Sequence, residues 1–282
     1  MGATGRIGMI LRKYWDEPTI SWQARTPQSG GGWVVLDPLG DPGALARAAG
    51  GCAAILCLAG VVPGRAGAGA PGAMAGNIAL AEAALRAAEP GARVLLASSA
   101  AVYGARPGLL REDDVPAPLS EYGRAKADME RRGAELGAAR DVAVSALRIG
   151  NVAGVDAILG GWRPGFRLDR FADGCTPRRS YIGVQTLARV LRDLIVAPDL
   201  PGVLNIAAPG AIGMGDLLDA ANLDWTPRRA PDTAIAEVRL CTDRLVRLTG
   251  FGAAESTPAA MVEQWRETGS GTGSEDIRGG RH

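Results

Sequence analysis

The chain has 282 residues, 31 Lys and Arg against 30 Asp and Glu, and a single histidine, His282, at the last position. This length suits one large α/β domain or a domain with a smaller lobe, and the balanced charge predicts neither a nucleic-acid partner nor an anionic membrane surface. With one histidine the chain cannot build a Ser-His-Asp triad, a Cys-His dyad or an HExxH zinc site. Acid–base chemistry must therefore fall to Tyr, Lys, Asp or Glu.

Membrane, secretion and metal signals are weak throughout. No apolar run reaches the roughly twenty residues of a membrane span, and glycines and charges interrupt the N-terminal stretch too early for a signal peptide. The protein is therefore expected in the cytoplasm, without a membrane partner. The four cysteines, Cys52, Cys57, Cys175 and Cys241, have no CxxC spacing. We expect reduced core residues and no metal site.

The chain opens on "MGATGRIG", in which Gly2, Gly5 and Gly8 have the GxxGxxG spacing of a phosphate-binding turn. Such a turn joins a strand to a helix whose N-terminal amides face the anion. The following "RIGMILRKYW" suits the helix, but no apolar strand precedes the glycines. The first strand of the sheet is apparently missing, so we expect the true start to lie upstream. Ordinary loop glycines are the alternative.

After this turn, short apolar runs alternate with Ala- and Leu-rich helical stretches, which predicts parallel strands joined by crossover helices. The predicted strands are 19–25, 32–37, 53–60, 92–99, 142–149 and 202–208. The predicted helices are 41–50, 77–91, 120–138, 184–196 and 258–267. The fold class is therefore α/β, a Rossmann-like doubly wound parallel sheet with a small C-terminal substrate lobe. We expect a dinucleotide-binding domain over 1–150, a substrate lobe with returning sheet segments over 151–267, and a disordered tail over 268–282.

Several polar or small residues follow the predicted strands, and ligands of doubly wound sheets bind at the carboxyl ends of the strands. Arg25 stands where a dinucleotide site usually has an acid for the ribose hydroxyls, and an arginine there suits the 2′-phosphate of NADP. A solvated strand-end arginine is the alternative. Asp37 could bond the adenine amino group or only cap its turn. Small residues at 58–60 permit close approach of a cofactor, and Ser98 and Ser99 end the next strand.

Tyr122 and Lys126 are four residues apart in a predicted helix and therefore share one face. A lysine ammonium beside a phenol favours the phenolate, so we expect Lys126 to lower the pKa of Tyr122 toward neutral pH. Tyr122 would then both donate and accept protons. A half-buried tyrosine beside a solvated lysine is the alternative.

Taken together, "GATGRIG", "LAG", "SSAAVYG", "YGRAK" and "LRIGNV" occur in an order and at intervals that resemble the extended short-chain dehydrogenases/reductases. More narrowly, residues 2 to about 210 resemble the NAD-dependent epimerase/dehydratase family, which acts on nucleotide sugars. The resemblance implies a catalytic set in which Ser99 bonds the reacting sugar oxygen, Tyr122 is the general acid/base, and Lys126 assists Tyr122 and holds the nicotinamide ribose. It implies that Asn77 supports the active-site architecture, although Asn also serves as a helix N-cap.

The residues expected to bind NAD or NADP are Gly2, Thr4, Gly5, Arg6, Ile7, Gly8, Arg25, Asp37, Leu58, Ala59, Gly60, Asn77, Tyr122 and Lys126. Those expected to bind the sugar-like substrate are Ser99, Asn151 and Arg179. Ala100 and Ala101 occupy places where dehydratases of this family carry acidic groups, so dehydration is not expected. Gly183 and Ser180 replace the histidine and aspartate of the family's "RDYIHV" segment, which weakens the expectation of a nucleotide clamp; a solvated basic loop is the alternative for Arg179.

We therefore expect an NAD(P)-dependent epimerase or oxidoreductase that acts on a sugar hydroxyl or carbonyl, with a nucleotide-linked sugar as the expected substrate. Two alternatives remain: an NADP-dependent reductase of a small carbonyl compound, and a non-catalytic dinucleotide-sensing module. The family commonly dimerises through the tyrosine-bearing helix and the helix before it, and the Ala-rich faces of 77–88 and 125–139 permit such packing. We expect a homodimer, which sedimentation of a monomer would overturn.

Overall fold

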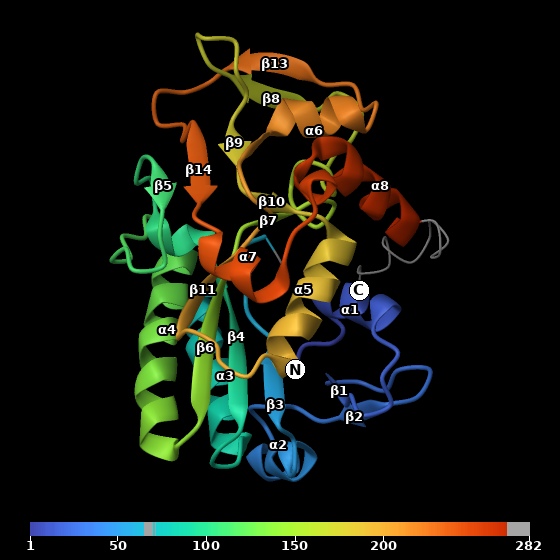
Figure 1. The fold of residues 1–282 in the computed structure, drawn as a ribbon, viewed down its shortest axis with the longest axis vertical. Coiled ribbons are helices and arrows are strands. Elements are labelled where there is room, and N and C mark those ends of the chain that lie inside the picture. Colours follow the sequence, from blue (N-terminus) through green and yellow to red (C-terminus); the bar gives the residue numbers. More distant parts are fainter. Residues whose placement is uncertain (65–69, 71, 270–282) are drawn as a thin grey trace. The chain divides into compact units, whose positions relative to one another are not determined.

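The computed structural model describes residues 1–64, 70 and 72–269. Figure 1 shows their helices and strands, and their contacts divide the chain into two units. The first unit comprises 1–106, 111–149 and 193–205, and the second comprises 107–110, 150–192 and the described residues from 206 onward. Of the tail expected over 268–282, residues 270–282 lie outside the described residues, while 268 and 269 still belong to the last helix.

The core of the first unit is a four-stranded sheet with the strand order β11-β6-β4-β3. Its strands are β3 (Ala54–Cys57), β4 (Arg93–Ser99), β6 (Ala143–Ile149) and β11 (Val203–Ile206). β3, β4 and β6 pair in parallel. Val94, Leu95 and Leu96 are completely buried because helices and loops cover both faces of a parallel sheet. The predicted Rossmann-type α/β fold is confirmed.

A second, smaller pair of strands, β1 (Trp22–Ala24) and β2 (Trp33–Val35), is also parallel. No strand precedes α1 (Arg6–Tyr14) in the described chain. Instead, the Met1 amino group donates to the Leu56 carbonyl of β3 at 2.7 Å, and the Ala3 amide donates to the Gln23 carbonyl of β1 at 3.2 Å. The first three residues are thus hydrogen-bonded to β3 on one side and to β1 on the other.

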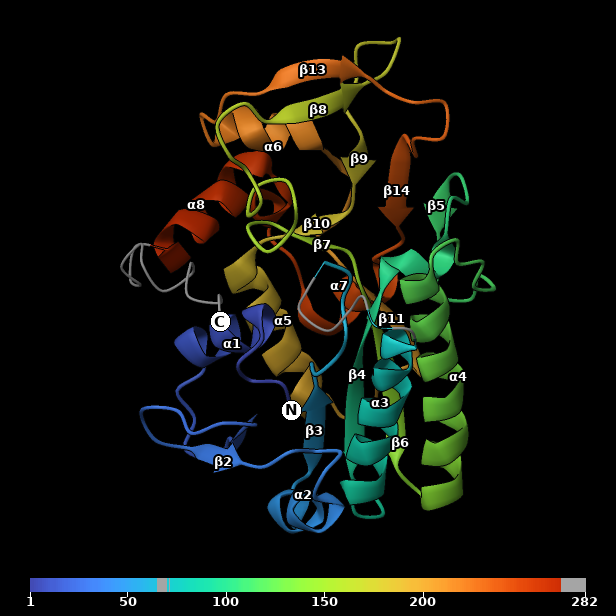
Figure 2. The same ribbon diagram turned by 180° about the vertical axis from the view of Figure 1, so that it is seen from behind.

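Three further helices of this unit are α2 (Pro42–Ala49), α3 (Gly76–Ala87) and α4 (Glu121–Arg140), with the 3₁₀ turns η1 (Ala73–Ala75) and η2 (Ala100–Tyr103). α3 and α4 lie side by side against one face of the sheet (Figure 2). α4 begins where Ser120 Oγ accepts the Gly123 amide at 3.0 Å, because the first amides of a helix need acceptors from outside it. α3 ends earlier than the predicted 91, because Pro90 cannot continue a helix.

Glycines let α4 approach the sheet closely. A Cβ atom on Gly123 would lie 2.6 Å from the Ala101 carbonyl oxygen, and one on Gly137 would lie 2.3 Å from a Val144 methyl group. Gly133 is similar, since its Cβ would lie 2.7 Å from a Leu96 methyl group. Separations this short leave no room for a methyl side chain, so the backbone of α4 packs directly on η2 at Gly123 and on sheet side chains at Gly133 and Gly137.

The second unit contains three small sheets and the remaining helices. Its sheets have the orders β12-β9-β14-β5, β10-β7 and β13-β8. The strands are β5 (Leu109–Leu110), β7 (Asn151–Val152), β8 (Arg167–Arg170), β9 (Arg178–Arg179), β10 (Tyr181–Ile182), β12 (Ile212–Gly213), β13 (Thr226–Arg229) and β14 (Glu237–Leu240). The helices are α5 (Val184–Val196), whose last turn belongs to the first unit, α6 (Met214–Ala220), α7 (Asp243–Thr249), η3 (Ala253–Ser256) and α8 (Pro258–Gly269). Among the helices of the described residues, none has the length and apolar character that a membrane span requires.

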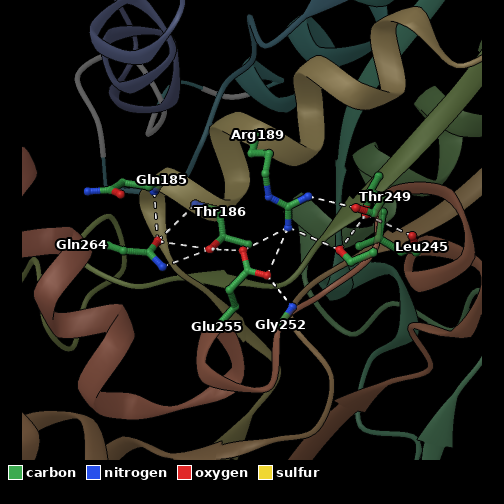
Figure 3. Close-up of polar contacts among 9 residues, drawn as sticks. Gln185, Thr186, Arg189, Leu245, Thr249, Gly252, Glu255 and Gln264 are labelled. Carbon is green, nitrogen blue, oxygen red and sulfur yellow. Dashed lines mark hydrogen bonds and ion pairs between the residues drawn. The ribbon is translucent and has the colours of Figure 1, made fainter.

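Polar side chains of the second unit fasten its C-terminal segments to α5 (Figure 3). Gln264 of α8 accepts the Gln185 and Thr186 amides, both at 3.1 Å, and so caps the N-terminus of α5. Gly183 makes room for this cap, because a Cβ atom there would lie 2.2 Å from Gln264 Oε1. One turn further along α5, Arg189 donates to the Thr249 carbonyl at 2.9 Å and to the Glu255 carboxylate at 3.0 Å.

This geometry predicts that Gly183→Ala and Gln264→Ala are not additive. The Gly183→Ala methyl group displaces the Gln264 side chain, so each substitution removes the same cap and is expected to cost about 1 kcal/mol of unfolding free energy. Urea denaturation of the two single variants and the double variant measures the coupling. A double variant that loses the sum of the two single losses would contradict the shared mechanism.

Candidate functional site

The structure brings Ser99, Tyr122 and Lys126 together at the carboxyl end of β4. Ser99 is the last residue of that strand, and its Oγ accepts the Ala101 amide at 3.2 Å, which opens η2. The Tyr122 hydroxyl, in the first turn of α4, forms a hydrogen bond with the Ser99 side chain. Lys126 lies one turn further along, with Nζ 5.8 Å from the centre of the Tyr122 ring. The three side chains thus lie together, and their catalytic role remains a prediction.

The Lys126 side chain is almost fully buried, with 3% of its surface exposed. Its Nζ donates to the Ala97 carbonyl at 2.7 Å. Burial lowers the pKa of Lys126 to about 8, against the opposing influence of Cys57 and Glu130. At neutral pH the ammonium form therefore still predominates, while a modest rise in pH would discharge it.

The expected direction of the Tyr122 pKa is wrong for this structure. Burial raises the pKa of Tyr122 above its ordinary value, and the hydrogen bond with Ser99 only partly opposes the rise. The physical reason is desolvation: the phenolate loses more stabilisation by leaving water than it gains from the hydrogen bond with Ser99. Tyr122 is therefore a neutral phenol at pH 7, ready to donate a proton.

Asn77 joins the loop after β3 to α3 and lies beside Lys126. Its Oδ1 accepts the Val61 amide at 3.2 Å, and its Nδ2 donates to the carbonyls of Val61 and Met74 at 3.0 and 3.1 Å. A Cβ atom on Gly60 would lie 2.7 Å from Asn77 Oδ1 and 3.3 Å from Lys126 Nζ. Asn77 is not the N-cap of α3, since that place belongs to Ala75, so the capping alternative is wrong.

The glycine turn at 2–8 lies directly against the loop at 58–60. Gly2 has φ +79°, and a Cβ atom there would lie 2.6 Å from the Ala59 amide nitrogen. Gly5 precedes the first residue of α1, so the start of that helix carries no capping side chain. Gly8 packs against the turn, where a Cβ atom would lie 2.6 Å from the Gly2 carbonyl oxygen. Gly2 and Gly8 are thus required by close packing of backbone on backbone, which brings the turn against the loop at 58–60.

The other residues expected to bind the cofactor surround this turn. Thr4 and Arg6 are exposed, and Ile7 and Leu58 are half-buried. Arg25 is exposed directly after β1. Asp37 is exposed after β2. Its Oδ1 accepts the Leu39 amide at 3.1 Å, so Asp37 caps the local turn, which is one of the two roles predicted for it.

Sequence reasoning missed Gln23, which fastens the glycine turn to both small strands. Gln23 Oε1 accepts the Gly2 amide at 3.0 Å, and Nε2 donates to the Leu36 carbonyl at 2.9 Å. Its side chain is buried. A glutamine within an apolar strand was the available signal, because a buried amide requires partners.

A buried ionic network behind the site was also missed. Arg148 of β6 forms an ion pair with Glu130 of α4, with Nη2 2.8 Å from Oε2. Arg148 Nη1 also donates to the Tyr103 hydroxyl at 3.0 Å, and that hydroxyl donates to Asn205 Oδ1 at 2.8 Å. Ser98, adjacent to Ser99, donates to Glu130 Oε1. Arg148 and Ser98 lie within the motifs that carry the family resemblance, but neither received this role from the sequence.

The two residues expected only at the substrate lie in the second unit. The Asn151 side chain forms a hydrogen bond with Tyr181, whose hydroxyl donates to Asp156 Oδ2 at 2.7 Å. The Arg179 guanidinium donates to the carbonyls of Arg178 at 2.7 Å and Ile235 at 3.0 Å, which ties β9 to the segment before β14. Their role toward a substrate remains a prediction.

A parallel α/β sheet with a glycine turn near its strand ends is typical of the Rossmann-type folds. The family model of the NAD dependent epimerase/dehydratase family matches residues 1–166. The chain belongs to that family. The resemblance found in the motifs is therefore confirmed. Among curated proteins no match to the sequence is found.

Solved structures confirm the fold at low sequence identity. MoeE5 in complex with UDP-glucuronic acid and NAD superposes with a TM-score of 0.72 at 23% identity, covering 95% of this chain and 98% of MoeE5. The UDP-glucose 4-epimerase of Thermus thermophilus, in complex with NAD, gives 0.69 at 18% identity, with 94% and 97% covered. RMD from Pseudomonas aeruginosa, complexed with NADPH, gives 0.67 at 18% identity, with 95% and 98% covered.

Proposed function

We propose that this protein is an NAD(P)-dependent epimerase or oxidoreductase that acts on a hydroxyl or carbonyl group of a nucleotide-linked sugar. The observation that carries the proposal is the meeting of Ser99, Tyr122 and Lys126 at the end of β4. Membership of the epimerase/dehydratase family supports it, as do the UDP-glucuronic acid and NAD in the MoeE5 structure.

The residues of the first unit fit a dinucleotide. The glycine turn and the start of α1 would hold the pyrophosphate, Asp37 and Arg25 would lie toward the adenosine half, and Gly60, Asn77 and Lys126 toward the nicotinamide half. When bound, the nicotinamide group would exchange a hydride with the substrate carbon. Exposed Arg25 provides a cation for a 2′-phosphate and so favours NADP over NAD at this one position.

The side chains of the chain itself would move the proton. Ser99 would hold the reacting oxygen, and Tyr122 would donate a proton to a carbonyl or remove one from a hydroxyl. Because burial raises the pKa of Tyr122, the resting phenol is the acid form, and oxidation of a hydroxyl requires stabilisation of the phenolate. The cationic Lys126 one turn away would supply that stabilisation.

The test is to denature the purified protein and identify the nucleotide that it releases. Near-stoichiometric NAD is expected for an epimerase, since such an enzyme oxidises and reduces its substrate without exchanging the cofactor. A nucleotide-free protein that binds NADPH reversibly would favour the reductase of a small carbonyl compound, for which Arg25 argues. A protein that neither contains nor binds a dinucleotide would overturn the proposed function.

A further inference from the structure

Three residues of α4, spaced four apart, contact the last three residues of β4. Tyr122 bonds the Ser99 side chain, Lys126 Nζ donates to the Ala97 carbonyl, and Glu130 accepts from Ser98 Oγ. A spacing of four places all three side chains on the face of α4 that is turned to the sheet. Glu130 is thus the next member of the series that holds the two candidate catalytic residues.

Glu130 is fixed more firmly than either of them. Its side chain is 7% exposed, and both carboxylate oxygens accept from the Arg148 guanidinium: Oε1 from Nε at 3.2 Å and Oε2 from Nη2 at 2.8 Å. Arg148 is in turn fixed by the Tyr103 hydroxyl and by the Glu112 carbonyl, at 3.0 and 3.1 Å. Two parallel hydrogen bonds between a planar guanidinium and a carboxylate fix the orientation of the carboxylate.

The groups that face Lys126 differ in charge at neutral pH. Burial raises the pKa of Cys57, so its thiol is neutral, and burial lowers the pKa of the nearby Met1 amino group. Tyr122 is a neutral phenol because burial raises its pKa as well. Of Cys57 and Glu130, the two acids whose charge acts on Lys126, Glu130 is the one that forms an ion pair, with Arg148.

We propose that Glu130 is a positioning residue that fixes the Lys126 turn of α4 against the end of β4 and holds the proton on Lys126 through its negative charge. The proposal rests on the proposed function for the importance of Lys126. Arg148 forms a buried ion pair with Glu130, and Ser98 links the carboxylate to the strand that carries Ser99. The proton affinity of Lys126 would thus depend on the Glu130–Arg148 ion pair, which would touch neither the substrate nor the cofactor.

The experiment is an NMR pH titration of the protein labelled with ¹³C at the lysine ε-carbon. The sequence contains two lysines, Lys126 and the exposed Lys13, so each spectrum has two assignable signals and Lys13 serves as the internal reference. The Lys126 midpoint is expected near pH 8 in the unaltered protein. In Glu130→Gln we expect it to fall by about one pH unit, a tenfold loss of proton affinity, because the anion is gone and the Arg148 cation remains.

Ser98→Ala is the matched control, since it removes one hydrogen bond of Glu130 without changing any charge; its midpoint is expected to stay within about 0.3 units. If the unpaired Arg148 prevents Glu130→Gln from folding, the double variant Glu130→Gln/Arg148→Gln, which buries no charge, is expected to show a smaller fall. An unchanged midpoint in the variant that folds, or loss of the fold in both, would assign the pair to structure alone and overturn the proposal. The titration needs no turnover, so a shifted midpoint in a protein without dinucleotide binding would leave this inference standing and remove only the proposed function.

Discussion

Replacing Tyr122 by phenylalanine is expected to lower turnover by at least about 10²-fold, the range in which a lost general acid is usually found. The phenylalanine ring keeps the packing beside Lys126 and removes only the hydroxyl that bonds Ser99. Nucleotide content and the melting temperature should therefore stay close to those of the unaltered protein. Turnover is measured by NMR on a panel of UDP-sugars and by NADPH oxidation with small carbonyl compounds.

Tyr14→Phe is the matched control for this experiment, because Tyr14 ends α1 and has no place in the candidate catalytic set. Its turnover should equal that of the unaltered protein. Full activity in Tyr122→Phe would show that the phenol moves no proton. A protein that binds the dinucleotide and turns over no compound of the panel, with or without Tyr122, would favour a dinucleotide-sensing module.

Arg148→Met is expected to have the largest effect on stability, a loss of about 3–5 kcal/mol of unfolding free energy. The substitution leaves the Glu130 carboxylate buried without its cation and removes a donor from the Tyr103 hydroxyl. Removing one partner of a buried ion pair is strongly destabilising, because the other charge is left buried and uncompensated, whereas replacing the whole pair by apolar residues is often nearly neutral. Urea denaturation followed by circular dichroism measures the loss.

Arg131→Met supplies the control on the same helix. Arg131 pairs with Glu135 at 2.8 Å, but the two side chains are 58% and 62% exposed. A solvated pair of this kind is worth about 0–1 kcal/mol, so little change is expected. Equal losses of unfolding free energy in Arg148→Met and Arg131→Met would contradict the prediction, because they would show that leaving Glu130 buried without its cation costs no more than breaking an exposed ion pair.

The sequence predicted those parts of the site that depend on local spacing. The glycines at 2–8 and the pair Tyr122 and Lys126 follow rules of turn and helix geometry, and the fold followed from the alternation of strands and helices. The sign of the Tyr122 pKa could not be predicted in this way, because it depends on how deeply the first turn of α4 is buried. Burial is a property of the assembled structure.

Glu130 and Gly183 show what local rules cannot reach. In "ADMERR", residues 127–132, Glu130 resembles a solvated charge on a helix surface. Only the glycines at 133 and 137 indicate that this face of the helix packs against the sheet. Gly183 departs from the family's pattern for a reason that lies far along the chain, since Gln264 fills the space of its missing side chain. Neither partner, Arg148 or Gln264, is near in sequence to the residue that it explains.

The cap on α5 has a consequence for the order in which the protein forms during synthesis. Gln185 is bonded by a residue 79 positions later, so α5 leaves the ribosome long before its N-terminal amides can find their acceptor. A chain grows by about 5–20 residues per second, which leaves α5 without Gln264 for several seconds. Native closure of the second unit must therefore wait until α8 has been made, whereas the α3–α4 side of the first unit can assemble well before.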